Sequence, residues 1–127
     1  MSVLTDEMQD IIANSELFSL ATASSAGVPN VVPVKFLRVV DDATIWITDN
    51  YFEKTLANLQ ENPQVAFYIW SSDIKKSFQI KGTVEILQSG ADYENMKAIV
   101  REKKATLPAK SLVVMNITDI FDCMPKK

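Results

Sequence analysis

The amino-acid sequence predicts a mainly β fold, in which six strands form an antiparallel barrel and helices pack on its outside. Six short stretches rich in apolar and β-branched residues are separated by turn-forming residues, whereas three stretches have apolar residues at helical spacing. Strands and helices do not alternate regularly, which disfavours a parallel sheet built from strand–helix–strand units. The predicted order of elements is α-β-β-β-α-β-β-α-β.

The chain is expected to form a single domain over residues 1–127. This length is enough to bury a hydrophobic core, and 47% of the residues are apolar while only three are glycine. No internal repeat or low-complexity linker divides the sequence. A packed globular domain, rather than a disordered chain, is therefore expected.

The three predicted helices are recognised by apolar residues that recur three or four positions apart. The first covers residues 3–15, the second begins near Lys54 and ends before Pro63, and the third begins at about residue 91. Their apolar stripes are Leu4, Met8, Ile11 and Ile12 in the first helix, Phe52, Leu56 and Leu59 in the second, and Tyr93, Met96, Ile99 and Val100 in the third.

The predicted strands cover residues 17–23, 31–40, 44–48, 65–70, 77–87 and 111–121. These stretches are rich in apolar, β-branched or aromatic residues and are bounded by polar turns such as SSAGVPN and SSDIKK. Pro33 lies inside the second stretch and favours a sheet edge or a bulge there, because proline lacks an amide hydrogen. Gly82 interrupts the fifth stretch and indicates a bulge or the close approach of another backbone.

Histidine is absent and cysteine occurs once, at Cys123, which excludes several kinds of catalytic and metal site. Without histidine there can be no Ser-His-Asp or Cys-His nucleophilic machinery, and the commonest metal ligand is missing. A single cysteine can form neither an internal disulfide nor a Cys-x-x-Cys pair, so Cys123 is interpreted as structural or exposed. Any redox chemistry must therefore come from a cofactor.

The overall charge disfavours a nucleic-acid partner. The chain has 13 basic and 16 acidic residues, for a formal net charge of −3, and its basic residues form only pairs such as Lys75-Lys76 and Lys103-Lys104. No apolar stretch reaches the roughly 20 residues that a membrane span requires. The acidic beginning MSVLTDEMQD lacks a signal-peptide pattern, so a cytoplasmic protein without a membrane partner is expected.

The stretch 45–70, IWITDNYFEKTLANLQENPQVAFYIW, has the strongest functional signal in the chain. It predicts a strand that turns directly into a helix, with Lys54 and Thr55 in the opening turns and Asp49 or Asn50 as the N-cap. The amides at a helix start and the positive end of the helix dipole attract anions. An ammonium and a hydroxyl beside them add charge-assisted hydrogen bonds, so this helix start is a candidate phosphate site. The alternative is that Lys54 and Thr55 are simply solvated helix residues.

Four segments, in this order, resemble the pyridoxamine 5′-phosphate oxidase-like, FMN-binding split β-barrel family and its small bacterial FMN-binding members. The segments are LATASSAGVPNVVPVKF, IWIT, EKTLANLQENPQVAFYI and FQIKGTVEI, and they span about residues 17–87. The resemblance implies a split β-barrel that forms a homodimer with FMN at the subunit interface. It also implies an oxidoreductase in which FMN transfers hydride or electrons, with a small-molecule substrate or redox partner.

The resemblance further implies which residues bind the cofactor. Lys54 and Thr55 match positions that contact the flavin phosphate. Contacts through the backbone are implied at the end of a strand, and others on the strand beneath the ring system and just before FQIKG. These positions are Ile47, Thr48 and Asp49; Val31, Val32, Val34 and Lys35; and Ser77, with Gln79 as a nearby alternative. Tyr51 is a candidate to cover an edge of the cofactor.

The sequence departs from the larger oxidases of this family in its basic residues. Those enzymes place basic residues on the strand occupied here by residues 32–37 and just before Lys54, where this chain has Glu53. The C-terminal Trp and Arg region of the vitamin-producing enzymes is missing, which disfavours pyridoxamine 5′-phosphate as substrate. A non-enzymatic flavin carrier or sensor is one alternative. A deazaflavin-dependent reductase of the same fold is another, although this acidic chain offers little positive charge for a longer anionic tail.

Overall fold

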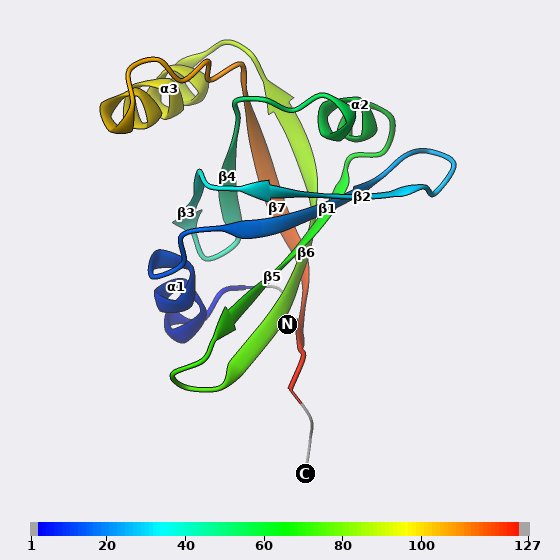
Figure 1. The fold of residues 1–127 in the computed structure, drawn as a ribbon, viewed down its shortest axis with the longest axis vertical. Coiled ribbons are helices and arrows are strands. Elements are labelled where there is room, and N and C mark those ends of the chain that lie inside the picture. The colour runs from blue at the N-terminus through cyan, green and yellow to red at the C-terminus, as the bar shows by residue number, and fades with distance from the viewer. Residues whose placement is uncertain (1–2, 125–127) are drawn as a thin grey trace.

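The computed structural model describes residues 3–124, which contain seven strands and three helices (Figure 1). The helices are α1 (Asp6–Ala13), α2 (Lys54–Glu61) and α3 (Ala91–Lys103). The strands are β1 (Phe18–Ala23), β2 (Pro29–Val34), β3 (Leu37–Asp41), β4 (Thr44–Asp49), β5 (Gln64–Ser71), β6 (Lys76–Leu87) and β7 (Ser111–Asp122). Within residues 3–124, no helix is long and apolar enough to cross a membrane.

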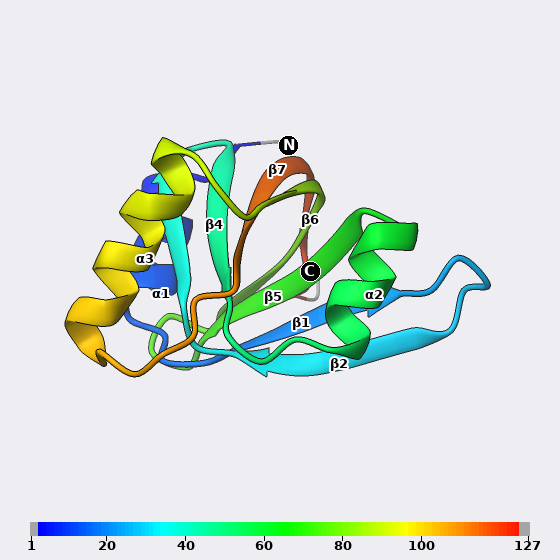
Figure 2. The same cartoon turned by 90° about the horizontal axis from the view of Figure 1, so that it is seen from above.

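All seven strands belong to one sheet with the order β2-β1-β5-β6-β7-β4-β3, and every pair of neighbours is antiparallel. The sheet curls into a half-barrel with the helices at its periphery, and Figure 2 shows α1 and α3 on one side and α2 on the other. α1 packs against β3 and β5, α2 against β1 and β2, and α3 against β4 and β7. The prediction of a mainly β, antiparallel fold with peripheral helices is confirmed.

The prediction of six strands is wrong, because residues 31–40 contribute to two strands rather than one. β2 and β3 lie at opposite edges of the sheet, and Lys35 and Phe36 connect them. The Phe36 carbonyl oxygen accepts a hydrogen bond from the Thr48 amide at 3.0 Å, which fixes this crossing to β4. The observed order is therefore α-β-β-β-β-α-β-β-α-β. Pro33 lies on β2, an edge strand, as its missing amide hydrogen predicts.

The inward-facing side chains of the sheet form the main hydrophobic core. Along β5, buried residues alternate with more exposed ones, and Val65, Phe67 and Ile69 face inward. Phe18 and Phe67 meet edge to face, with their ring centroids 6.0 Å apart. A smaller cluster holds α3 and the chain after it: Met96, Val100, Leu107, Ala109 and Leu112. Full burial of one large apolar side chain contributes about 1.5–3 kcal/mol, so both clusters hold the elements around them in place.

The predicted irregularity at Gly82 is confirmed. The register of β6 against β7 shifts between Lys81 and Gly82. A Cβ atom at Gly82 would clash with the Asn116 carbonyl oxygen on β7 and lie 2.9 Å from the Met115 Cε atom. Glycine therefore permits the two backbones to approach at this point.

Candidate functional site

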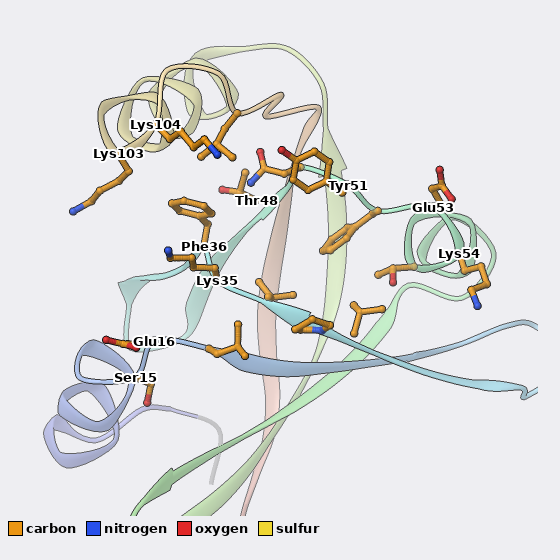
Figure 3. A pocket seen from close by; sticks show the side chains of 18 of the residues that line it. Ser15, Glu16, Lys35, Phe36, Thr48, Tyr51, Glu53, Lys54, Lys103 and Lys104 are labelled. Carbon is orange, nitrogen blue, oxygen red and sulfur yellow. The ribbon is translucent and has the colours of Figure 1, made fainter.

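A cleft of about 1230 Å³ lies between β2, the start of α2 and the end of α3 (Figure 3). Typical small-molecule sites occupy roughly 300–1,000 Å³, so the cleft has room for a flavin-sized ligand. It is lined by the predicted cofactor-binding residues Val32, Val34, Lys35, Thr48, Lys54 and Thr55. The other lining residues are Ser15, Glu16, Leu17, Asn30, Pro33, Phe36, Asn50, Tyr51, Phe52, Glu53, Lys103, Lys104 and Leu107.

α2 begins at the cleft with Lys54, and no side chain caps the first turn of this helix. α1 differs, because the Thr5 hydroxyl caps its first turn. The prediction that Asp49 or Asn50 caps α2 is wrong, since Glu53 occupies the N-cap position. The first amides of a helix have no partner within the helix, so an uncapped start leaves amide N–H groups that can donate hydrogen bonds to an anion.

Thr55 belongs to a polar network beside the cleft. Its hydroxyl oxygen accepts a hydrogen bond from the Asn30 side-chain amide at 3.0 Å. The same amide donates to the Thr22 hydroxyl at 3.2 Å, and the Asn58 side-chain amide donates to that hydroxyl at 3.1 Å. Thr55 is only 2% exposed. A hydroxyl that accepts a hydrogen bond can still donate its own hydrogen, for instance to a phosphate oxygen.

The end of β4 places one predicted residue on the cleft and buries two others. Thr48 lines the cleft, whereas Ile47 lies in the main core. Asp49 is fully buried, and its carboxylate accepts hydrogen bonds from the Phe52 amide and the Ser111 hydroxyl, both at 2.9 Å. The Asp49 side chain therefore holds the turn into α2 and does not line the cleft.

The part of the cleft formed by β2 and the crossing to β3 carries apolar and aromatic side chains. Val32 lines the cleft, whereas Val31 is 65% exposed and does not line it. Phe36 and Tyr51 both lie in the central part of the cleft in Figure 3, and Lys35 is the neighbour of Phe36 at the crossing. An apolar wall with aromatic side chains is suited to a flat ring system.

Ser77 and Gln79 lie away from the cleft, on the outward-facing side of β6. Gln79 is directly opposite Tyr68 of β5 and Phe121 of β7, which are 52% and 49% exposed. Ser77 is opposite Trp70, which is also 52% exposed. These two predicted residues are therefore surrounded by exposed aromatic side chains and are not brought together with Lys54.

Lys103 and Lys104 also line the cleft, and sequence reasoning missed them as site residues. In the sequence they are recognisable only as a basic pair near the end of the third helix. Their place beside β2 depends on how α3 packs against β4 and β7, which no local pattern reveals. The same holds for Asn30 and Leu107, whose residue types carry no signal of a binding site.

The loop between α3 and β7 is held by side-chain hydrogen bonds. Arg101 Nε donates to the Leu107 carbonyl oxygen at 3.1 Å. The Tyr93 hydroxyl donates to the Ala109 carbonyl oxygen at 2.7 Å, and the Ala109 amide donates to the Asn50 side-chain oxygen at 2.9 Å. Ala109 has a φ of 45°, a conformation that is strained for alanine and persists only where neighbouring contacts enforce it. These bonds keep Leu107 on the wall of the cleft.

The charged side chains of the cleft suit an anionic ligand. Four lysines and two glutamates line it: Lys35, Lys54, Lys103 and Lys104 with Glu16 and Glu53. The cleft is therefore net positive, although the whole chain has a net charge of −3. Among residues 3–124, no group of three or more histidine, cysteine, aspartate or glutamate side chains is placed to hold a metal ion.

Several known proteins are similar to this chain in sequence or in structure. An uncharacterized protein of Methanocaldococcus jannaschii is 36% identical over 122 residues, which cover 94% of this chain and 80% of that protein. HupZ of Group A Streptococcus has a similar structure, with a TM-score of 0.83, 28% identity and coverage of 94% of each chain. An FMN-binding protein of Syntrophomonas wolfei shares the fold, with a TM-score of 0.79, 24% identity and coverage of 92% of this chain and 83% of that chain.

Almost the whole described chain takes part in a family match. Residues 4–124 match the model of the pyridoxamine 5′-phosphate oxidase family. The match includes every strand and helix of the half-barrel and all the residues that line the cleft. The chain therefore belongs to the pyridoxamine 5′-phosphate oxidase family.

Proposed function

We propose that this protein binds FMN in the cleft between β2, α2 and α3 and acts as an FMN-dependent oxidoreductase. The observation that carries the proposal is the uncapped start of α2, which presents Lys54, Thr55 and its first amides to a cleft of flavin size. Membership of the pyridoxamine 5′-phosphate oxidase family, and a fold shared with an FMN-binding protein, support a flavin as the ligand.

The parts of FMN match different parts of the cleft. The Lys54 ammonium, the Thr55 hydroxyl and the first amides of α2 would hold the phosphate, because each donates to an anionic oxygen. Val32 and Phe36 would pack against the ring system, and the exposed Tyr51 would cover one edge of it. The side chain of Asp49 would act indirectly, by holding the turn into α2.

Bound FMN would supply the hydride or electron transfer that the side chains of this chain cannot carry. Lys35 and Thr48 both line the middle of the cleft and would donate hydrogen bonds to polar atoms of the ring system. The remaining wall would exclude water from one side of the ring. This division of roles requires no histidine, in agreement with a sequence that has none.

The experiment is to purify the protein, record its absorbance spectrum, and identify by mass spectrometry any chromophore released on denaturation. FMN added to chromophore-free protein should bind with one site per chain and quench its own fluorescence. Turnover with a chemical reductant and an added electron acceptor would separate an oxidoreductase from a flavin carrier. A folded protein that neither contains nor takes up FMN would contradict the proposal.

We also propose a homodimer in which a second copy covers the outward-facing side of β5, β6 and β7. Tyr68, Trp70 and Phe121 are about half exposed on this side, and exposed apolar groups of this size mark interaction surfaces. Ser77 and Gln79 lie among them and would contribute to a cofactor site across the subunit interface. Such a contribution would explain why they do not line the cleft of their own chain.

A deazaflavin-dependent reductase is a second candidate, and the charge of the cleft favours it. The acidic composition of the chain predicts little positive charge for a long anionic tail, yet four lysines line the cleft against two glutamates. The mass of the released chromophore distinguishes the two candidates directly. Retention of a deazaflavin with FMN excluded would support the second one.

A further inference from the structure

The cleft has a second positively charged end, which the flavin phosphate at α2 would not use. Lys103 and Lys104 line the end next to α3, and Figure 3 places them across the cleft from Lys54. A second hollow of about 730 Å³ adjoins this end, shares Lys35 and Lys103 with the cleft, and adds Arg38. Positive side chains from α3, β3 and the crossing after β2 therefore gather at one place.

Few carboxylates offset this charge. Glu16 lines the cleft near α1, and Asp10 lines the adjoining hollow. The salt bridges formed among residues 3–124 lie elsewhere, so no carboxylate in that part of the chain comes within 4.0 Å of the Lys103 or Lys104 ammonium. In an acidic protein, a group of cations without carboxylate partners is well placed to attract an anion from solution.

The backbone that carries the two lysines is held in place. Lys103 ends α3, the Lys104 amide donates to the Val100 carbonyl oxygen at 3.2 Å, and the Leu107 amide donates to the Lys104 carbonyl oxygen at 3.2 Å. Leu107 contributes apolar surface to this end of the cleft, and Phe36, in the central part, packs against the hydrophobic cluster that contains Leu107. This end therefore combines positive point charges with an apolar wall.

We propose that this end of the cleft binds the anionic group of the substrate, a carboxylate or sulfonate carried on a flat apolar body. Lys103 and Lys104 pair with the anion, while Phe36 and Leu107 contact the apolar body. This inference depends on the proposed function, since the substrate lies beside a flavin whose phosphate is held at Lys54. Lysines in the last turn of a helix also complement the helix dipole, but that role needs no ligand and predicts no preference for anions.

The test is a calorimetric titration of the FMN-loaded protein with naphthalene-2-sulfonate and, separately, with the uncharged naphthalene-2-sulfonamide. The flavin difference spectrum reports whether either probe lies beside the ring. The double variant Lys103→Gln/Lys104→Gln should bind the sulfonate about tenfold or more weakly, because charge-assisted hydrogen bonds are lost, and should bind the sulfonamide as before. The control, Lys75→Gln/Lys97→Gln, removes the same charge from lysines outside the cleft and should retain full sulfonate affinity.

Three results would overturn the proposal: equal wild-type affinity for the two probes, an equal loss of sulfonate affinity in both double variants, or sulfonate binding that competes with FMN. The third result would assign Lys103 and Lys104 to the cofactor instead. If the protein takes up no FMN, the proposed function fails, and the same titrations on the flavin-free protein still show whether these lysines select an anion.

Discussion

The Asn30 side-chain amide donates a hydrogen bond to the Thr55 hydroxyl at 3.0 Å and so connects β2 to the first turn of α2. The same amide contacts the Thr22 hydroxyl at 3.2 Å, which ties the pair to β1. Two walls of the cleft are therefore joined through one side chain. Because Thr55 accepts from Asn30, its hydroxyl hydrogen is directed away from that amide and is available to a phosphate.

Replacement of Asn30 should weaken both the fold and the site. Asn30→Ala removes two part-buried hydrogen bonds, each worth roughly 0.5–1.5 kcal/mol, so the free energy of unfolding should fall by about 1–3 kcal/mol. FMN affinity should fall as well, because Thr55 loses its orientation. Urea denaturation and FMN titration measure the two effects. Asn95→Ala, at an exposed position of α3, is the control. Equal stability and equal FMN affinity in the two variants would show that the Asn30 hydrogen bonds contribute to neither property.

Lys54 should distinguish FMN from riboflavin, which lacks the phosphate. Lys54→Gln should lower FMN affinity about tenfold to a hundredfold, since a hydrogen bond to a charged group contributes roughly 1.5–3 kcal/mol. Riboflavin affinity should not change, and the free energy of unfolding should change little because Lys54 is exposed. Fluorescence titration with both ligands checks this, with Lys97→Gln as the charge-matched control. Equal losses of affinity for FMN and riboflavin would show that Lys54 does not bind the phosphate.

The strands could be predicted from the sequence where apolar alternation is bounded by turns, but the division of residues 31–40 could not. That stretch is rich in β-branched and other apolar residues on both sides of Lys35 and contains no glycine, asparagine or aspartate, so no turn signal marks the change of direction. The break results from a tertiary contact, in which the Phe36 carbonyl oxygen accepts from the Thr48 amide. Pro33 correctly indicated an edge strand, because that inference needs only the missing amide hydrogen.

From local sequence pattern alone, the candidate site was predictable where strand and helix meet directly, whereas Val32, Val34 and Lys35 were assigned to it through the family resemblance. Lys54 and Thr55 follow β4 within a few residues, so the sequence pattern alone places them at a helix start. Lys103 reaches the same cleft from another helix, and only the packing of α3 brings it there. Asp49 is a residue for which the sequence pattern was misleading, because a carboxylate before a helix is typical of a cap or a ligand contact. In the structure Asp49 is fully buried and accepts a hydrogen bond from the Ser111 hydroxyl.

Asp49 should matter more for stability than any exposed carboxylate. Asp49→Ala leaves the Phe52 amide and the buried Ser111 hydroxyl without their acceptor, and an unsatisfied buried group costs about 1–3 kcal/mol. We expect the free energy of unfolding to fall by about 2–4 kcal/mol in urea denaturation. Ser111→Ala removes only one of the two bonds and should cost less. If Asp49→Ala proved no worse than Asp119→Ala at an exposed position of β7, the buried role would be excluded.

Replacement of Gly82 by any larger residue should lower the stability of the protein. In Gly82→Ala the new methyl group meets the Asn116 carbonyl oxygen and the Met115 side chain, so β6 and β7 must separate locally. Overpacking of this kind costs roughly 1–3 kcal/mol, which thermal denaturation followed by circular dichroism would detect as a lower Tm. Thr83→Ala, at the exposed neighbouring position, should change stability by less than about 1 kcal/mol. An unchanged Tm in Gly82→Ala would mean that the two strands are more loosely paired than their register implies.

The proposed dimer makes a prediction that also tests the positions of Ser77 and Gln79. Phe121→Glu places a charge on the outward face beside Gln79, and an unpaired charge buried in an interface costs several kcal/mol, so the variant should be monomeric in sedimentation velocity. Val40→Glu, at a 45% exposed position of β3, should remain dimeric. Weaker FMN binding by the Phe121 monomer would support a cofactor site completed across the interface. A monomeric wild type would contradict this arrangement. A dimeric Phe121→Glu variant would also contradict it, because the dimer would then not form through the exposed aromatic face.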